Sequence, residues 1–238
     1  RDLYSSDLAL RFERSWSPEQ LASIWGPMLA KAPRLGLPAV LGLDSAGEIH
    51  GRLEQLLGIE IFEIPTLPPS VPGLRLERTL RRHALLLGCR IVEGAHVIGR
   101  IDGRSGGSRV LGVVAETAAG PRAFDADAVL LATGGFLHGG LRASRGGSVV
   151  DSVFGLPIRA PADREQWFGD RCLAAHPYDL LGLNVNDRLQ PVDRRGEPYY
   201  SNVFACGGIL GGVDRRAENC RQGIDLATAY AAVGSIAA

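Results

Sequence analysis

The sequence predicts an α/β fold, and three features of its pattern support this class. Segments whose apolar residues recur at helical spacing alternate with short runs of strand character. Two of these runs, residues 128–133 and 202–206, are continuously apolar, which is typical of strands buried on both faces of a parallel sheet. Between residues 89 and 127, four strand-like runs separated by glycine-containing turns predict a β-meander.

The first 64 residues predict a small α/β layer of their own, part of a cap or substrate domain. Ser17 and Pro18 suit the first positions of a helix, and the residues that follow are apolar at helical spacing. Residues 38–43, P-A-V-L-G-L, predict a short buried strand, and residues 48–57 predict a second helix.

Prolines dominate the next segment, residues 64–73, which reads I-P-T-L-P-P-S-V-P-G. Because proline fixes the backbone and lacks an N–H donor, we expect a rigid joint between two parts of the chain. Residues 74–87 then predict a helix that ends at Gly88. Its arginines suit a solvated or partner-facing surface; they are Arg75, Arg78, Arg81 and Arg82.

The last helix, residues 223–237, is rich in Ala and Leu, and we expect its inward residues to be Ile224, Ala227, Ala231 and Ile236.

We predict that residues 1 to about 64 have a core separate from that of the two apolar strands. The predicted parts of the chain are residues 1–64 (cap or substrate domain), 65–135 (binding-domain segment with the meander), 136–200 (loop-rich, substrate side) and 201–238 (C-terminal binding-domain segment).

The composition is that of an ordinary globular chain without excess charge. The 238 residues are 45% hydrophobic, and 26 basic side chains balance 26 acidic ones. No overall positive field is therefore present to gather nucleic acid. No apolar run approaches the roughly 18 residues of a membrane span. The cysteines form no C-x-x-C pair, so we expect reduced thiols and no metal site; they are Cys89, Cys172, Cys206 and Cys220.

Both continuously apolar runs end in a glycine pair, which points to a ligand. Gly134-Gly135 follows the first run and Gly207-Gly208 follows the second. Ligands of open parallel sheets bind beyond the carboxyl ends of the strands, and glycine lets the backbone approach them. A helix start follows the second pair, and helix N-terminal amides favour anionic oxygens. We therefore predict a nucleotide-like cofactor against both pairs, with the two strands in one sheet and their carboxyl ends on one side.

The order of these motifs resembles the flavoproteins that contain two dinucleotide-binding domains. In that superfamily, segments like A-T-G-G at residues 132–135 and N-V-F-A-C-G-G at residues 202–208 line the flavin. The run I-P-T-L-P-P-S-V-P-G-L-R-L at residues 64–76 is similar to a signature of the B subunit of anaerobic glycerol-3-phosphate dehydrogenase. The resemblance covers nearly all of the chain from about residue 17, and it implies an incomplete Rossmann-like FAD/NAD(P)-binding domain.

The resemblance also implies an activity, a cofactor and partners. In that family, glycerol 3-phosphate is oxidised to dihydroxyacetone phosphate, and the electrons pass to membrane quinone in fumarate or nitrate respiration. The implied cofactor is a non-covalent flavin, FMN or FAD. The implied partners are the A and C subunits of the same complex, of which the first is catalytic and the second is an iron–sulfur protein that anchors the complex to the membrane. The implied location is cytoplasmic, on the inner face of the cell membrane through those partners.

One departure from the family concerns the phosphate of the flavin. The family begins with a strand and G-x-G-x-x-G, and no such motif leading into a helix occurs in these 238 residues. The chain opens with Arg1 rather than Met, so we expect a piece of a longer protein that binds flavin poorly or not at all and is inactive alone. Two alternatives stay open: another FAD-dependent oxidoreductase of the fumarate reductase or succinate dehydrogenase type, and a non-catalytic scaffold or electron-transfer subunit.

The expected flavin contacts follow from the matched motifs. Asp214 suits the ribityl hydroxyls or, equally, a solvated turn, and the start of the last helix suits negative charge on the reduced ring. The full set is Thr133, Gly134, Gly135, Gly207, Gly208, Gly211, Gly212, Asp214, Gln222 and Gly223.

Four further residues are weaker catalytic candidates. His138 and His176 could accept the proton of an alcohol that loses hydride, although a lone loop histidine is more often structural. Arg142 and Arg145 could clamp a phosphate, although surface arginines in a loop are the commoner case.

Overall fold

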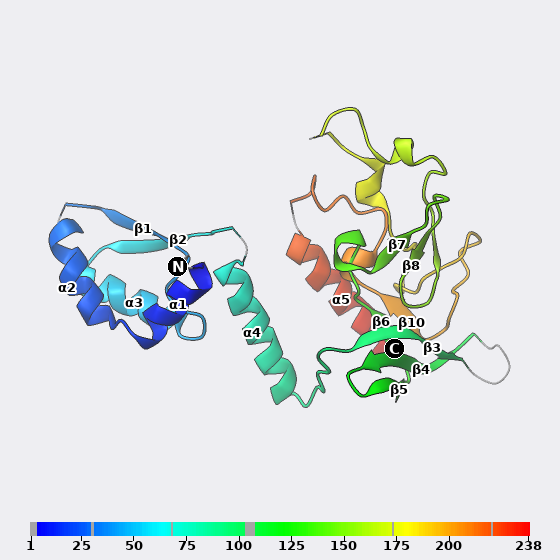
Figure 1. Cartoon of the computed structure of the whole chain (residues 1–238), viewed down its shortest axis with the longest axis horizontal. Coiled ribbons are helices and arrows are strands. Elements are labelled where there is room, and N and C mark those ends of the chain that lie inside the picture. Colours follow the sequence, from blue (N-terminus) through cyan, green and yellow to red (C-terminus); the bar gives the residue numbers. More distant parts are fainter. Residues whose placement is uncertain (1–3, 30, 68, 103–107, 173, 220) are drawn as a thin grey trace. The chain divides into compact units, whose positions relative to one another are not determined.

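A computed structural model describes residues 4–29, 31–67, 69–102, 108–172, 174–219 and 221–238 (Figure 1). The chain divides into two compact units, Arg1–Val92 and Glu93–Ala238. The division falls after the helix that follows the proline segment, and not at residue 64, where the composition shift suggested it. No helix in the described ranges is long and apolar enough to cross a membrane.

The described part of the first unit contains four helices and a pair of parallel strands, and three of the helices, α1 to α3, form its main core with the strands. Its core includes Phe12, Leu21, Leu53 and Ile61, with Trp25 partly buried against them. This core contains no residue of the second unit, as the separate-core prediction requires. The elements are α1 (Ser5–Arg14), α2 (Pro18–Leu29), β1 (Arg34–Pro38), α3 (Ala46–Leu57), β2 (Glu60–Ile64) and α4 (Val71–Leu86).

The strand predicted at residues 38–43 is wrong, because β1 ends where that segment begins. Residues 39–43 form a buried loop instead, in which the Leu41 N–H donates to Oε1 of Glu63 at 2.9 Å. A side chain therefore replaces the strand partner that a buried backbone donor would otherwise need. Two elements, α1 and β2, were not predicted.

Helix α4 is anchored to the first unit by apolar and ionic contacts. Ser70 caps its start by accepting the Gly73 N–H, and Val71 packs fully buried against Ala9 and Leu43. The prediction of a solvated arginine face is wrong for Arg75, whose side chain is 20% exposed and forms a two-point ion pair with Glu63. Arg78 also pairs with a carboxylate, that of Asp44, at 2.6 Å.

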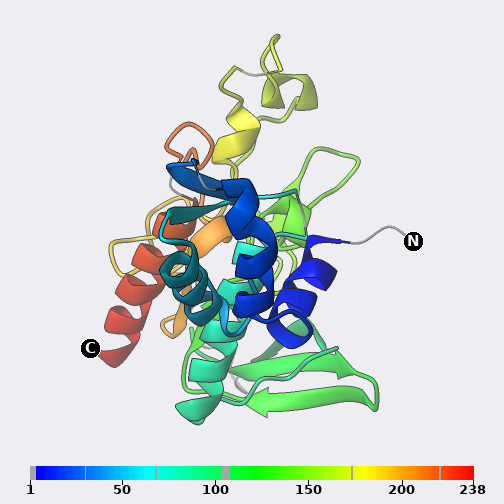
Figure 2. The same ribbon diagram turned by 90° about the vertical axis from the view of Figure 1, so that its left-hand side faces the viewer.

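The second unit begins with the predicted meander, three antiparallel strands that lie side by side (Figure 2). Residues 89–93, C-R-I-V-E, predicted as the first strand of the meander, do not have strand conformation and are exposed. The meander strands are β3 (His96–Asp102), β4 (Val110–Thr117) and β5 (Gly120–Asp125).

Two short strands form the parallel pair on which the site depends. Strand β6 (Val129–Leu131) pairs with β10 (Val203–Ala205), with Val203 opposite Val129 and Ala205 opposite Leu131. This confirms the prediction that both strands lie in one sheet with their carboxyl ends on the same side. Alternate residues of β10 face opposite layers, as the strand period of two requires.

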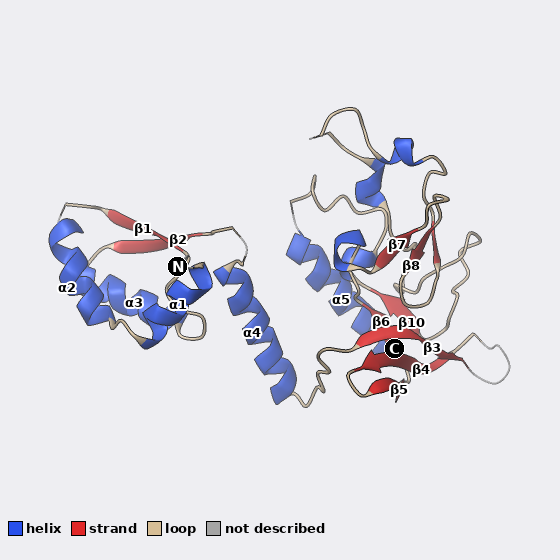
Figure 3. Cartoon of the chain, viewed as in Figure 1, coloured by secondary structure: helices blue, strands red, loops and turns tan. Residues whose placement is uncertain are grey.

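One layer against this pair is the loop-rich segment, shown mostly in tan in Figure 3. The main core of the unit lies here and includes Leu131, Val203, Ala205, Trp167 and Leu183. The segment contains a three-stranded antiparallel sheet and short 3₁₀ turns: η1 (Phe136–His138), β7 (Leu141–Ala143), β8 (Val149–Asp151), β9 (Pro157–Ile158), η2 (Arg164–Trp167), η3 (Pro177–Leu180) and, after β10, η4 (Gly207–Ile209).

The other layer is helix α5 (Arg221–Ala237), which packs small residues on β10. Ala232 is fully buried against Phe204 and Cys206, with Ala229 beside them. The predicted inward face is wrong for three of its four residues, since Ala227, Ala231 and Ile236 are exposed. Ile224 is half-buried. Alanine side chains let α5 approach β10 closely, and the larger apolar residues of the helix, Leu226, Tyr230 and Val233, are exposed.

Candidate functional site

The two glycine loops meet where β6 and β10 end. A Cβ added to Gly208 would lie 3.3 Å from the Cα of Gly134, and one added to Gly135 would lie 3.3 Å from the Gly208 carbonyl oxygen. Side chains are therefore excluded here partly because the two backbones approach each other. Gly134 and Gly207 also have positive φ angles, +74° and +71°, which L side chains rarely adopt.

A pocket of about 360 Å³ opens beside these loops. Four of the ten residues predicted to contact flavin line it: Thr133, Gly134, Gly207 and Gly208. The complete lining is Ala132, Thr133, Gly134, His138, Cys206, Gly207, Gly208, Arg215, Asp225 and Ala229.

Helix α5 fixes the loop after β10. The Gly207 N–H donates to Oγ1 of Thr228 at 2.9 Å, and the Thr228 hydroxyl donates to the Ile224 carbonyl oxygen at 2.7 Å. A Cβ on Gly207 would stand 2.9 Å from Oδ1 of Asp225. The loop thus lies against the first turns of α5, and a side chain at Gly207 would require the Asp225 carboxylate to move.

The pocket holds one ion pair and one buried thiol. Arg215 donates from Nη2 to Oδ1 of Asp225. The Cys206 side chain is buried, and burial, followed by the charge of Asp225, raises the pKa of its thiol above the ordinary 9.0. Cys206 therefore stays protonated and weakly nucleophilic near neutral pH. Cys89 and Cys172 are exposed free thiols, and Cys220 lies outside the described residues.

Two polar atoms of the pocket lining are buried without a partner. Oγ1 of Thr133 and Nε of Arg215 have no hydrogen bond within the described ranges. Native proteins rarely leave such groups unpaired, since each costs about 1–3 kcal/mol. Both atoms belong to residues of the same pocket, so a polar ligand fits this site.

The remaining predicted flavin contacts have other structural roles. A Cβ on Gly211 would stand 2.8 Å from the Gly182 carbonyl oxygen, so this glycine permits two backbone segments to cross. Gly212 donates its N–H to the Leu180 carbonyl oxygen. Asp214 accepts the N–H groups of Arg216 and Ala217, as a turn aspartate does. Gln222 and Gly223 are exposed and do not line the pocket.

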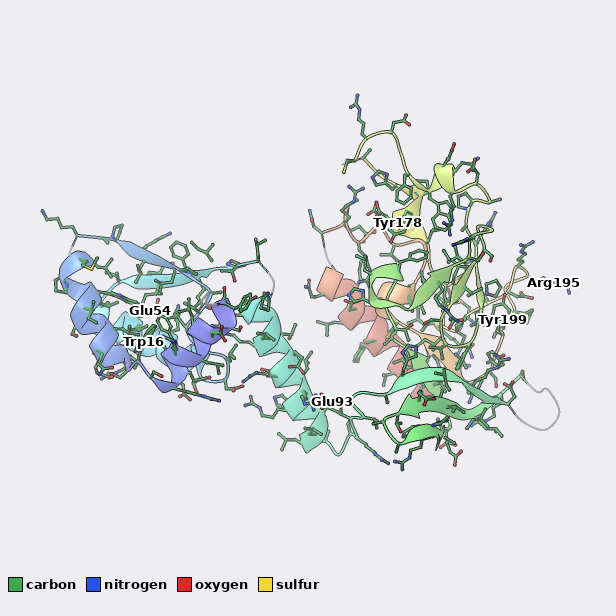
Figure 4. All side chains as sticks on the ribbon, viewed as in Figure 1. Trp16, Glu54, Glu93, Tyr178, Arg195 and Tyr199 are labelled. Carbon is green, nitrogen blue, oxygen red and sulfur yellow. The ribbon has the colours of Figure 1, made fainter. Side chains whose placement is uncertain are left out.

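The structure separates the two candidate histidines. His138 lines the pocket, and a Cβ on Gly134 would come within 2.7 Å of its Cβ. His176 instead accepts the Gly169 N–H on Nδ1 at 2.9 Å, and its Nε2 lies 3.0 Å from the Cys172 carbonyl oxygen. Both ring nitrogens of His176 are thus used to hold a loop. The η3 turn that follows contains Tyr178, which is labelled in Figure 4.

Neither candidate arginine reaches the pocket. Arg142 lies on β7 and donates to the Ser152 carbonyl oxygen at 3.3 Å, and Arg145 lies in the following turn. Both are exposed. Both are surface arginines, which is the interpretation that the sequence offered as the alternative to phosphate binding.

Several pocket residues were not predicted. Asp225 and Ala229 are four residues apart and so share one face of α5. Their spacing was readable from the sequence, but the apolar periodicity favoured a different face. Arg215 is one of two consecutive arginines after G-G-V-D, and no sequence pattern distinguishes it from Arg216. Arg216 turns away and pairs with Asp179 at 3.0 Å.

The comparison with protein families gives the class of protein to which the chain belongs. The family described as "FAD binding domain" matches residues 10–224, so the chain belongs to this family. FAD is the cofactor that the family binds, and the unpaired pocket atoms and glycine cradle fit a non-covalent flavin.

Two curated relatives of the chain are named as the B subunit of the same enzyme. The chain is 37% identical over 203 residues to a protein of Halobacterium salinarum named as the probable B subunit of anaerobic glycerol-3-phosphate dehydrogenase, covering 85% of this chain and 47% of the relative. It is 32% identical over 245 residues to the B subunit of the same enzyme from Vibrio cholerae, covering 100% of this chain and 53% of the relative. These similarities confirm the resemblance drawn from the motifs. The chain spans about half the length of these relatives.

Among solved structures, the crystal structure of T. acidophilum thioredoxin reductase aligns with 90% of this chain and 55% of its own. The sequence identity is 14% and the TM-score is 0.19, which is too low to carry an argument about the fold.

Proposed function

We propose that this chain forms the flavin-ring side of one subunit of anaerobic glycerol-3-phosphate dehydrogenase. The observation that carries the proposal is the pocket between Gly134 and Gly207, with its unpaired Thr133 and Arg215 atoms. Family membership and the names of the relatives support it. The proposed reaction is oxidation of glycerol 3-phosphate to dihydroxyacetone phosphate, with electrons passed to membrane quinone.

The residues of the chain have distinct roles in this proposal. The bound flavin would supply the two-electron acceptor. The glycine loops would cradle its ring, Thr133 would donate or accept one hydrogen bond, and His138 would lie beside the same ring. The proposed partners are the catalytic and the iron–sulfur subunits of the same complex, with attachment to the inner face of the membrane through them.

The proposal is tested by flavin titration, followed by fluorescence quenching. The two samples are residues 1–238 alone and a hybrid chain in which residues 1–238 replace the matching part of the Vibrio cholerae relative. We expect tight FAD binding by the hybrid and weak binding by residues 1–238, because this chain has no G-x-G-x-x-G leading into a helix. Tight, stoichiometric binding by residues 1–238 would place the phosphate anchor within them and contradict this assignment.

A substitution in the hybrid tests the glycine loop directly. Gly207→Val should weaken FAD binding at least tenfold, since a branched side chain would meet Asp225 and strain a positive φ. Gly146→Val serves as the control, because a Cβ there meets only Oγ of Ser144, at 3.8 Å, and Gly146 is not in the pocket. Equal affinity in the Gly207→Val and Gly146→Val hybrids would remove this loop from the flavin site.

A further inference from the structure

Another pocket, of about 540 Å³, lies in the loop-rich segment of the second unit. It shares no lining residue with the pocket beside the glycine loops. Part of its lining is apolar, and its polar lining residues are Arg159, Asn184, Asp193, Arg194 and Tyr199. Sites for small molecules combine an apolar lining with a few polar groups in this way, and the polar groups decide which ligand fits.

The backbone around this pocket is fixed by the core and by hydrogen bonds. Ile158 of β9 is buried in the main core, and Arg159 follows it directly. Tyr199 packs partly buried against the same core. The Val192 N–H donates to the Asn184 carbonyl oxygen at 3.0 Å and joins the two remaining segments. The polar side chains therefore come from separate segments that are held in place.

A tight turn presents Arg194 to the pocket. Oδ1 of Asp193 accepts the N–H groups of Arg195 and Glu197, at 2.8 and 3.0 Å, and Gly196 completes the turn at a φ of +88°. Asp193 thus has a structural role in the turn. It is the one acidic residue among the described residues of this lining, which contains two arginines, so the lining has a net positive charge.

Four polar side chains of this lining are available to a ligand. Within the described ranges, no hydrogen bond or ion pair engages the side chain of Arg159, Arg194, Asn184 or Tyr199. Both arginines are exposed, so all the N–H donors of their guanidinium groups are accessible and unused. They differ from scattered surface arginines because they line one hollow together with an unused amide and an unused hydroxyl.

We propose that this pocket binds a phosphomonoester, with Arg159 and Arg194 donating to the phosphate oxygens and Asn184 or Tyr199 adding a further hydrogen bond. The apolar part of the lining holds the rest of the molecule. This inference goes beyond the proposed flavin function, because the site is separate from the flavin pocket and its binding requires no flavin.

Charge and donor arrangement favour a phosphate group over a carboxylate. A phosphomonoester carries up to two negative charges near neutral pH, which two guanidinium groups match even with Asp193 beside them. Its three terminal oxygens point in different directions, whereas the two oxygens of a carboxylate share one plane. Paired guanidinium donors suit phosphate oxygens, and donors from separate segments suit the tetrahedral group.

The test titrates four probes into residues 1–238 without flavin: glycerol 3-phosphate, AMP, succinate and glycerol. Binding is followed by the amide NMR signals of Arg159 and Arg194, which report weak affinities and locate the ligand. We expect a phosphate probe to shift both signals saturably, succinate to bind at least tenfold more weakly, and glycerol to have no effect.

The two phosphate probes identify the source of the ligand. Tighter binding of glycerol 3-phosphate assigns the pocket to small phosphorylated metabolites, and tighter binding of AMP assigns it to nucleotides. The inference is overturned if succinate binds as tightly as the better phosphate probe, or if neither phosphate probe shifts the signals at millimolar concentration.

Three variants test the role of the arginines. Arg159→Gln and Arg194→Gln should each weaken phosphate binding roughly tenfold to a hundredfold, as for a lost charge-assisted hydrogen bond. Arg195→Gln is the matched control, because Arg195, labelled in Figure 4, is an exposed residue of the same turn that does not line the pocket. It removes the same charge and should leave the affinity nearly unchanged at physiological ionic strength.

The outcomes separate a built site from general attraction and from misfolding. Equal losses in all three variants would show attraction by surface charge alone and overturn the site. Since neither lining arginine has a protein partner within the described residues, their substitution should preserve the fold, which circular dichroism verifies. A failed flavin titration leaves this result untouched, and a failed phosphate titration leaves the flavin proposal untouched.

Discussion

The backbone of Gly140 lies against the carbonyl group of Gly134 so closely that a Cβ on Gly140 would stand 1.9 Å from that oxygen. This contact closes the first glycine loop, which also contains a hydrogen bond from the Gly140 N–H to the Gly135 carbonyl oxygen at 3.0 Å. The loop therefore depends on a glycine outside the pocket lining.

Gly140→Ala should destabilise the second unit by about 1–3 kcal/mol or more, because the overlap is with backbone that cannot rotate away. Amide hydrogen exchange of peptides from β7 and β8 measures the loss within that unit. Gly146→Ala is the control and should change the exchange free energy by less than about 0.5 kcal/mol. Equal protection in the two variants would show that the first loop relaxes without cost.

Asn202 joins the meander to the parallel pair, and its removal should be costly. Its side chain accepts the Val110 N–H at 2.9 Å and donates to the carbonyl oxygens of Val110 and Asp127. Asn202→Ala removes this partner from the buried N–H and carbonyl oxygen of Val110, at a cost of about 1–3 kcal/mol for each, whereas the Asp127 carbonyl oxygen keeps a hydrogen bond from Arg109. Hydrogen exchange at Val110 should accelerate strongly, whereas Asn184→Ala, at an exposed position, should not change it.

The local pattern predicted elements well where a single partner layer determines the apolar positions. The meander, α3 and α4 have this property. The β6–β10 pair lies between two layers, but its continuously apolar runs and shared glycine ends placed both strands in one sheet. The pattern failed where a side chain replaced a strand partner, as Glu63 does for Leu41. It also failed for α5, because small residues pack closest to β10 and an apolar count favours the larger ones.

The candidate site was predictable in part for a related reason. Gly134 and Gly207 have positive φ angles that favour glycine, and a pair of glycines after an apolar run is visible in the sequence. The roles of Gly211 and Arg215 depend on contacts with Gly182 and Asp225, which are distant or unremarkable in the sequence. Such pairings become visible only when the chain is folded.

The ion pair of Glu63 and Arg75 should make the first unit sensitive to acid. Burial opposes ionisation of Glu63, but hydrogen bonds from the Arg75 side chain and the Leu41 N–H outweigh it and hold the pKa below the ordinary 4.5. A carboxyl whose folded pKa is depressed contributes stability that is complete above the unfolded pKa and is lost as pH falls through the folded pKa. The first unit should therefore lose stability below about pH 4.5.

Glu63→Gln tests this assignment in a Trp167→Phe background, in which the tryptophans of the first unit, Trp16 and Trp25, report its unfolding in urea. At pH 7 the substitution should cost about 1–3 kcal/mol, because Arg75 loses a partly buried partner. Between pH 5 and 3, the variant should lose less stability than the parent.

Some acid dependence should persist, because a second carboxyl, that of Glu13, also has a lowered pKa. Burial opposes this shift, and hydrogen bonds from the backbone N–H groups of residues 43–45 outweigh it. Glu60 lies on the same strand as Glu63 and forms an exposed ion pair with Arg34. Glu60→Gln should therefore keep the parental pH profile. A parental profile in Glu63→Gln would assign the acid sensitivity to another carboxyl.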